Sequence, residues 1–253
     1  MGSTFDRVAF GQRLGTRRLG RTLVTRGTVG STNDLAWEAC AAGAPDGTTV
    51  VADAQTGGRG RAGRVWHTTP GRSLALSLLL RPAGDRRAAG MLPLAAGLAV
   101  AQALESLGAR PGLKWPNDVL LGDRKLAGIL CEGRWHGEAL HWLAVGVGVN
   151  VCNPIPAAVA PRAVSLAEWL PAVRRLDLLD RLVPALAGGS VASGEAALSE
   201  RECAAFAERD WLSGRQLRSP AAGRARGLRP DGALLVDLGA ATVAVREGHV
   251  ELA

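Results

Sequence analysis

Residues 57–66 read Gly-Gly-Arg-Gly-Arg-Ala-Gly-Arg-Val-Trp, and this loop is the most informative part of the sequence. Glycine lets a backbone take positive φ values and approach a ligand closely. Arginine supplies a fixed charge with forked donors that suit phosphate or carboxylate, and Trp66 adds a flat face for a planar ligand. The loop by itself leaves three alternatives open: it binds a small anion, it binds RNA as arginine-rich segments do, or it is a solvated turn.

The loop connects two predicted strands. Along the chain, one predicted helix precedes the first strand and another follows the second. Ser31 and Asp34 have the spacing of a capping box, which predicts that a helix begins there. The run over 74–80 is almost entirely apolar, which is typical of a strand buried on both faces. The predicted elements in this half are strands over 48–53 and 73–80 and helices over 31–42 and 88–107.

The second half of the chain predicts a hairpin, further helices and a small β-domain. The predicted strands and turns are a short strand leading into 119–121, a turn at 122–123, a return strand over 125–132, a turn over 133–137 and a strand over 141–151. Helices are predicted over 165–170, 175–187 and 195–212. Five short strands over 216–218, 223–228, 233–236, 241–246 and 249–252 follow, and their close spacing predicts an SH3-like barrel.

The composition excludes several classes of protein. No run of eighteen apolar residues occurs, so no transmembrane helix and no membrane partner are expected. The first thirty residues contain no apolar stretch typical of a signal peptide. The four cysteines form no CxxC pair, which argues against a zinc site or a disulfide framework. These features predict a cytoplasmic protein.

The chain is basic, and the kind of basic residue is informative. The net charge of +7 permits a nucleic acid or an acidic protein as partner. Of the 30 lysines and arginines, only Lys114 and Lys125 are lysine, and they fall within one short segment. A lysine ammonium is compact and changes its proton affinity readily, whereas a guanidinium does not. These two lysines are therefore candidate functional residues rather than ordinary surface charges.

Three further segments carry candidate site residues. Ser31-Thr32-Asn33 stands at a predicted helix N-terminus, which offers free N–H groups, although an ordinary N-cap has the same pattern. Lys114-Trp115-Pro116-Asn117-Asp118 and residues 123–129 place two lysines and an acid near the ends of a hairpin. Gly146-Val147-Gly148-Val149-Asn150 predicts a smooth strand against which a flat ligand can lie. Neither a Rossmann fingerprint nor a GxxxxGK[ST] loop is present.

The order of these motifs closely resembles the biotin protein ligases. The resemblance rests on Ser-Thr-Asn, Gly-Arg-Gly-Arg-x-Gly-Arg-x-Trp, Lys-Trp-Pro-Asn-Asp, Arg-Lys-Leu-Ala-Gly-Ile-Leu and Gly-Val-Gly-Val-Asn, and it covers roughly residues 28–253. It implies that the chain activates biotin with ATP and Mg²⁺ to biotinyl-5′-AMP. It also implies transfer of the biotinyl group to one lysine of a biotin carboxyl carrier domain of acetyl-CoA carboxylase or a related carboxylase.

The resemblance also implies roles for particular residues. Lys125, Asp118, Lys114 and Arg61 are the expected catalytic residues, with Lys125 on the biotin carboxylate and α-phosphate and Asp118 orienting or deprotonating the acceptor lysine. The expected biotin-binding residues are Ser31, Thr32, Asn33, Gln55, Gly58, Arg59, Arg61, Lys125, Gly128 and Ile129. The expected adenylate-binding residues are Arg61, Arg64, Trp66, Asn117, Lys125 and Asn150. No protein-bound metal is assigned, because Mg²⁺ is expected to bind through the ATP phosphates.

The expected fold class is α+β (α/β-like), with a central mixed sheet flanked by helices and a small C-terminal SH3-like β-barrel. Residues 1–30 are expected to be a basic segment packed on or leading into the catalytic domain, 31–212 the biotin- and ATP-binding catalytic domain, and 213–253 the barrel. The short segment before the motifs predicts the monofunctional type without an N-terminal DNA-binding domain, so no DNA partner is expected. The resemblance allows a homodimer.

Two alternatives compete with this prediction. A lipoate or octanoate ligase of the same general fold binds a related acyl tail, but it lacks the Gly-Arg-Gly-Arg loop, and the octanoyl-transfer type needs a reactive cysteine. An arginine-rich nucleic-acid-binding protein would account for the charge but not for the placement of the lysines and asparagines.

Overall fold

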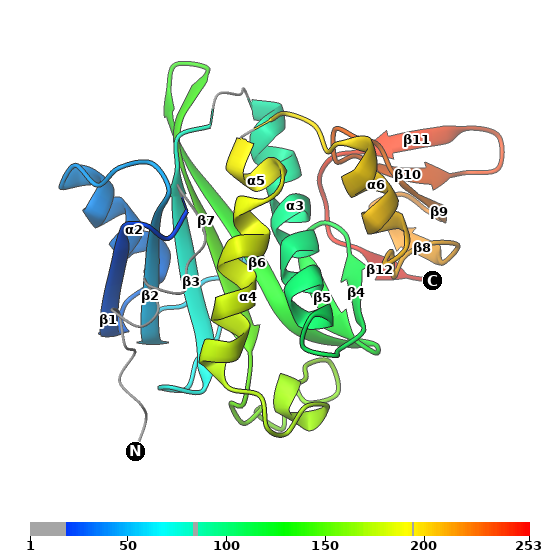
Figure 1. Cartoon of the computed structure of the whole chain (residues 1–253). Coiled ribbons are helices and arrows are strands. Elements are labelled where there is room, and N and C mark those ends of the chain that lie inside the picture. Colours follow the sequence, from blue (N-terminus) through cyan, green and yellow to red (C-terminus); the bar gives the residue numbers. More distant parts are fainter. Residues whose placement is uncertain (1–18, 83–85, 194) are drawn as a thin grey trace.

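The protein is described from a computed structural model covering residues 19–82, 86–193 and 195–253. A seven-stranded mixed sheet covered by helices is followed by a smaller five-stranded antiparallel sheet (Figure 1). This arrangement confirms the α+β class. The part of the predicted N-terminal segment that falls on residues 1–18 lies outside the described residues.

The large sheet has the strand order β1-β2-β3-β7-β6-β5-β4. β1 runs parallel to β2, and every other neighbouring pair in this sheet is antiparallel. The strands are β1 (Leu23–Val29), β2 (Thr48–Gln55), β3 (Ser73–Leu80), β4 (Pro111–Lys114), β5 (Asp118–Leu121), β6 (Arg124–His136) and β7 (Ala139–Asn150). β1 was not predicted, because Arg26 and Gly27 interrupt its apolar pattern at the sheet edge.

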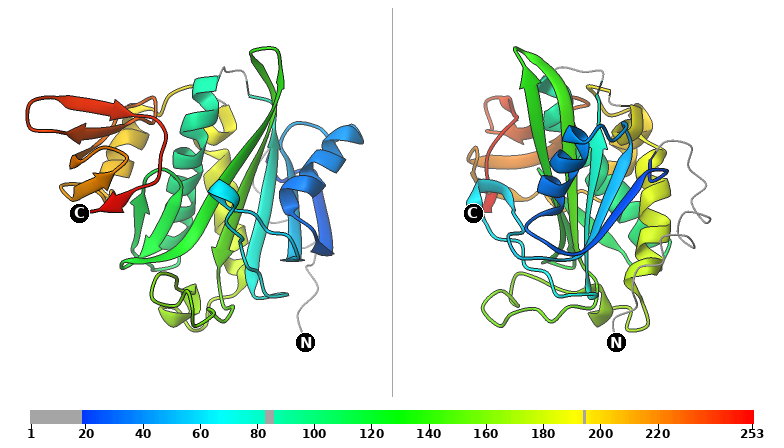
Figure 2. Two further views of the ribbon diagram at one scale, coloured as in Figure 1. Left: turned by 180° about the vertical axis from the view of Figure 1, so that it is seen from behind. Right: turned by 90° about the vertical axis from the view of Figure 1, so that its left-hand side faces the viewer.

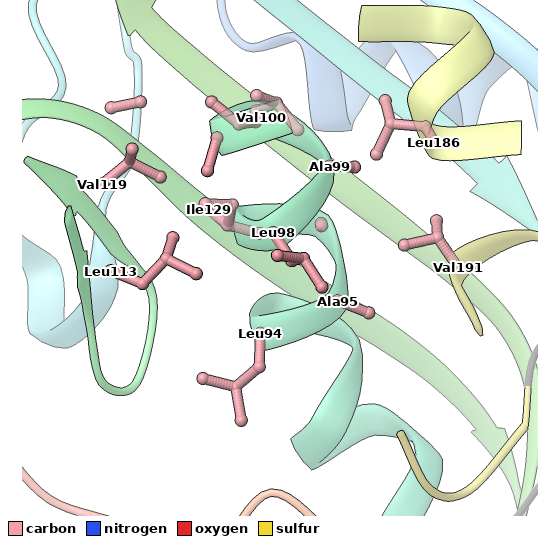
Figure 3. Close-up of a cluster of buried hydrophobic side chains, with 14 of the residues drawn as sticks. Leu94, Ala95, Leu98, Ala99, Val100, Leu113, Val119, Ile129, Leu186 and Val191 are labelled. Atoms are coloured by element: carbon pink, nitrogen blue, oxygen red, sulfur yellow. The ribbon is translucent and has the colours of Figure 1, made fainter. Parts of the chain in front are cut away.

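β3 lies inside the large sheet between β2 and β7, and its predicted bounds are confirmed at both ends. All eight of its residues are buried because helices cover both faces of the sheet. α3 (Arg86–Glu105) and α4 (Arg175–Ala187) cover one face, and α2 (Thr32–Ala41) covers part of the other (Figure 2). The broad apolar stripe of α3 packs Leu94 and Leu98 near Ile129 of β6 (Figure 3).

The turn predicted over 133–137 is wrong. β6 continues to His136, and the chain reverses at Gly137, which has a φ of 60°. Gly133 is instead a strand residue that accommodates a neighbour, since a Cβ there would lie 2.8 Å from Leu140 Cδ1. Glycine at this position therefore marks close packing beside a register shift at Arg134/Trp135.

The long helix predicted over 195–212 is also wrong. Within that range the structure has one short helix, α6 (Glu200–Ala207), which begins at a capping box formed by Ser199 and Glu202. The shorter helix α5 (Ser190–Ser193) lies before it. The chain then leaves the helix because it pairs with the edge strand β4: Leu113 N donates to Arg209 O at 2.7 Å.

The C-terminal unit is one antiparallel sheet with the order β11-β10-β9-β8-β12. The five predicted strands are confirmed as β8 (Gln216–Ser219), β9 (Gly223–Leu228), β10 (Leu234–Asp237), β11 (Thr242–Val245) and β12 (Glu251–Leu252). Their closure into an SH3-like barrel stays a prediction. The unit contacts the large domain through Trp115, whose Nε1 donates to Gly232 O at 3.0 Å.

Among the described residues, no helix has both the length and the apolarity needed to cross a membrane. All four cysteines are free thiols.

Candidate active site

The predicted segments converge on the face of the large sheet that α3 and α4 leave uncovered (Figure 2). The N-terminus of α2, the loop over 57–66 and the facing strands β6 and β7 meet there. Trp66 shows this convergence directly, because its indole lies against the backbone of Gly128 in β6 and Gly148 in β7. Residues far apart in sequence therefore line one surface.

The N-terminus of α2 presents a buried polar network. Thr32 donates to Gln55 Oε1 through its backbone N at 2.7 Å and through its hydroxyl at 3.1 Å. Ser77 Oγ lies 2.6 Å from Asn33 Oδ1 and 2.8 Å from Thr32 Oγ1. Ser77 was not predicted, although a polar residue inside the apolar run of β3 is a usable signal.

The predicted capping box at Ser31 does not form. The Ser31 side chain is an N-cap that accepts from Asn33 N. Asp34, the expected box partner, instead points away and binds Arg59 of the loop. The start of the helix was predicted correctly, but its acidic residue, Asp34, bonds to the distant loop over 57–66 instead of capping the helix.

The loop over 57–66 is a small hairpin. Trp66 N donates to Gly58 O at 2.8 Å, and Gly60 N donates to Arg64 O at 2.7 Å. The tip is a single 3-10 turn, Arg61–Gly63, in which Ala62 has a φ of 53°. Gly58 is required at the base, since a Cβ there would lie 2.3 Å from Trp66 O.

The three arginines of this loop have different environments. Arg59 is held by Asp34 and Glu132. Arg61 is exposed at the tip. Arg64 Nη2 lies 3.3 Å from His249 Nε2, so the C-terminal unit reaches the loop. Burial, together with the charges of Arg64 and Lys114, lowers the pKa of His249, which favours a neutral imidazole at neutral pH.

The two lysines and the acid lie together at the ends of β4, β5 and β6. Lys125 Nζ is 2.5 Å from Asp118 Oδ1, and Lys114 is paired with Asp118 in the β4–β5 register. Lys125 Nζ also lies 5.7 Å from the centroid of the Trp66 ring. Burial lowers the pKa of Lys114, an effect that the Asp118 carboxylate opposes. The loop and the lysine hairpin thus form one site.

The smooth face expected from the glycines of β7 is present, and side chains from other segments lie on it. A Cβ at Gly146 would lie 2.6 Å from Asn33 Oδ1, and a Cβ at Gly148 would lie 2.5 Å from Trp66 Cε2. Both glycines are therefore needed for close approach.

Replacing Gly148 with alanine is expected to lower the free energy of unfolding by about 1–3 kcal/mol, because the added methyl group overlaps the Trp66 indole. Chemical denaturation measures this change. The matched control is Gly27→Ala in β1, where nothing lies within 4 Å of the added Cβ. Equal unfolding free energies for the two variants would show that Trp66 does not rest on Gly148.

Other predicted residues have structural partners. Asn117 Nδ2 donates to Ile129 O at 2.8 Å. The Ile129 side chain lies in the core near α3, so only its backbone faces the site (Figure 3). Asn150 Oδ1 accepts from Asn153 Nδ2 at 3.1 Å, and Asn153 was not predicted. Within the described part of the chain, no group of three or more His, Cys, Asp or Glu residues could hold a metal ion.

Comparison with known proteins agrees with this arrangement. Residues 27–150 match the family model described as "Biotin/lipoate A/B protein ligase family". The fold and the site therefore define a protein of the biotin/lipoate ligase class.

Individual relatives narrow the class. The biotin–[acetyl-CoA-carboxylase] ligase of Mycobacterium tuberculosis is 37% identical over 234 residues, which cover 87% of this chain and 85% of that protein. The biotin protein ligase from Aquifex aeolicus in complex with biotin and ATP superposes with a TM-score of 0.78 at 27% identity, covering 92% of this chain and 99% of that one. The chain belongs to the biotin protein ligase family.

Some relatives are longer proteins. The bifunctional ligase/repressor BirA of Bacillus subtilis (strain 168) is 38% identical over 159 residues, which are 61% of this chain and 49% of that protein. The match thus spans about half the length of the two Bacillus BirA proteins.

Proposed function

We propose that this protein activates biotin with ATP to biotinyl-5′-AMP and then transfers biotin to one lysine of a biotin carboxyl carrier domain of acetyl-CoA carboxylase or a related carboxylase. The observation that carries the proposal is the position of Lys125, which stands between Asp118 and the Trp66 indole at the base of the arginine loop. The names of the relatives from Mycobacterium tuberculosis and Aquifex aeolicus support the same activity.

Activation joins two anions, so positive charge must meet the biotin carboxylate and the α-phosphate. Cations that are already in place stabilise the charge that develops in such a step. We assign this role to Lys125, Arg61 and Arg64. The backbone of Lys125 is braced by the 151–165 loop, since Lys125 N donates to Arg162 O at 2.8 Å. The carboxylate oxygen attacks the α-phosphorus, and pyrophosphate leaves.

The biotin end of the site is assigned to the polar network at α2. Ser31, Thr32 and Asn33 are buried, and Gln55 bonds directly to Thr32. Such a network can donate to and accept from a cyclic urea, which carries both kinds of group. Gly58 and the backbone of Gly128 would lie beside the rest of the biotin.

The adenine is assigned to Trp66 and Asn150, with Asn117 nearby on β5. The indole supplies a stacking face, and the Asn150 amide supplies edge contacts. Mg²⁺ would be held by the ATP phosphates rather than by a protein cluster, and it would neutralise phosphate charge when bound.

The transfer step is assigned to Asp118 and Lys114. The neutral amine of the acceptor lysine attacks the biotinyl carbonyl, an amide forms, the acyl–phosphate C–O bond breaks, and AMP leaves. Asp118 accepts the proton that the amine loses. Because Lys125 pairs with Asp118 here, binding of the substrate anion to Lys125 would free Asp118 for this role. A cytoplasmic location is proposed from the free cysteines.

The test is incorporation of biotin into a purified carrier domain with and without ATP. The proposal predicts ATP-dependent labelling of one lysine and biotin-dependent exchange of pyrophosphate into ATP. Lipoate and octanoate serve as controls, because a ligase for those acids shares the fold. Exchange with lipoate but not with biotin would overturn the biotin assignment.

Replacing Arg61 with glycine is expected to release biotinyl-5′-AMP about tenfold faster, because one charge that holds the phosphate is lost at the exposed tip. The released adenylate would then label bystander lysines. Both effects can be measured, the first by filtration of the enzyme-bound adenylate and the second by labelling of serum albumin. Arg226→Gln, on the C-terminal sheet, is the control, and an unchanged release rate for Arg61→Gly would refute the assignment.

A further inference from the structure

Arg59 is the loop arginine with the most contacts to other segments. Its guanidinium makes a bidentate pair with Asp34, with Nη1 donating to Oδ2 at 2.8 Å and Nη2 to Oδ1 at 2.7 Å. It also reaches Glu132, with Nε donating to Oε1 at 3.2 Å and Nη2 to Oε2 at 3.1 Å. Four of its five N–H donors are therefore occupied.

These contacts compensate the charge of Arg59 within the protein. One guanidinium faces two carboxylates, so the group of three carries an excess of negative charge. Arg61 and Arg64 lie in the same short loop but have no such arrangement among the described residues: Arg61 is exposed at the tip, and Arg64 faces His249. A substrate anion would meet little free positive charge at Arg59.

The group also links three separate elements. Asp34 belongs to α2, Glu132 belongs to β6, and Arg59 belongs to the first arm of the loop hairpin. Glu132 Oε2 accepts a further bond from Asn33 Nδ2 at 2.8 Å, and Asn33 is bonded to Ser77 of β3. Arg59 is therefore anchored to the polar network at the start of α2.

We propose that Arg59 is a positioning residue rather than a substrate ligand, and that Asp34 and Glu132 act as a clamp that fixes the first arm of the loop through it. The clamp leaves the tip over 60–64 as the part that closes on the adenylate, and Arg61 and Arg64 as its charges. This inference rests on the proposed function, and it also makes a prediction that is independent of activity.

The Asp34 carboxylate does not act as a pH switch near neutral pH. Bonding to the Arg59 guanidinium lowers the pKa of Asp34 below its ordinary value of 3.8, so this carboxylate stays charged above that value. The contribution of the Asp34 charge to folding stability is present above the unfolded-state pKa and is lost only as the pH falls through the lower folded-state pKa. Asp34 is therefore expected to contribute to the clamp in the same way throughout the neutral pH range.

The experiment compares Arg59→Gln with the double variant Asp34→Asn/Glu132→Gln and with all three changes combined. The amide replacements keep the size of each carboxylate. If the clamp positions the loop, the double variant weakens retention of the adenylate about fivefold, as Arg59→Gln does, and the triple variant is no worse. Arg226→Gln, which breaks an ion pair with Asp237 on the C-terminal sheet, is the matched control.

A direct contact between Arg59 and substrate predicts a different result. The double variant would then bind biotin as well as the wild type or better, because it frees the guanidinium. Adding Arg59→Gln to the double variant would weaken binding as much as Arg59→Gln weakens it in the wild type. Either finding overturns the clamp.

A second readout does not depend on catalysis. Limited trypsin digestion without ligand is scored by mass spectrometry for cleavage after Arg61 and Arg64. Each clamp variant is expected to be cut about fivefold faster than the wild type, whereas Arg226→Gln is cut at the wild-type rate. Equal rates for all variants would refute the clamp. A wild type without biotin-dependent pyrophosphate exchange would instead refute the proposed function.

Discussion

Replacing Lys125 with alanine is expected to slow the formation of biotinyl-5′-AMP by about 100- to 1,000-fold, the typical effect of removing one preorganised donor to a developing charge. Lys125 is positioned for this role from two sides. Its Nζ lies 2.5 Å from Asp118 Oδ1, and its backbone N donates to Arg162 O at 2.8 Å. No other lysine except Lys114 is present in the chain to substitute for it.

Pyrophosphate exchange measures the activation step, and transfer from preformed biotinyl-5′-AMP measures the second step. Lys125→Ala is expected to affect activation more than transfer. Arg124→Ala is the control, because Arg124 is adjacent to Lys125 in sequence but its side chain pairs with Glu168 instead of Asp118. If the Lys125→Ala variant exchanged pyrophosphate at the wild-type rate, Lys125 would have no role in the activation step.

Replacing Trp115 with alanine is expected to lower the free energy of unfolding by about 3–5 kcal/mol, the usual cost of deleting a large buried aromatic side chain. Trp115 is only 2% exposed. Its Nε1 donates to Gly232 O at 3.0 Å, so the change also removes a bond between the large domain and the C-terminal unit. Denaturant unfolding measures the loss.

The matched control is Trp169→Ala, at a tryptophan that is 52% exposed, which should change the unfolding free energy by about 0.5 kcal/mol or less. Trp115→Phe separates the two contributions, since it keeps most of the packing and removes the hydrogen bond, at a cost of about 1–3 kcal/mol. Equal stabilities of Trp115→Ala and Trp169→Ala would mean that Trp115 does not join the two units.

The prediction of elements was most successful where local pattern and tertiary environment agree. The apolar run of β3 marks its ends because both faces of that strand are buried. The prediction of elements failed where contacts with a distant segment decide the local structure. Residues 209–211 leave the predicted helix because they pair with β4, and Gly133 stays in its strand because Leu140 packs against it. β1 is an edge strand with several exposed residues, so its sequence carries a weak signal.

The candidate site shows the same division. The sequence by itself determined which groups are available: two lysines, three loop arginines, an acid and several amides, in an order that resembles one family. Residue type and spacing along the chain are local properties, so they can be recognised without coordinates.

Only the tertiary structure decided which groups surround each of those residues. The sequence shows three arginines in the loop over 57–66 but not their partners. In the structure Arg59 pairs with Asp34 and Glu132, which come from two other elements. Arg64 faces an imidazole supplied by the C-terminal unit. The electrostatic environment of a charge depends on what lies within a few ångströms of it, and for these arginines the nearest partners are as much as 185 residues away in sequence.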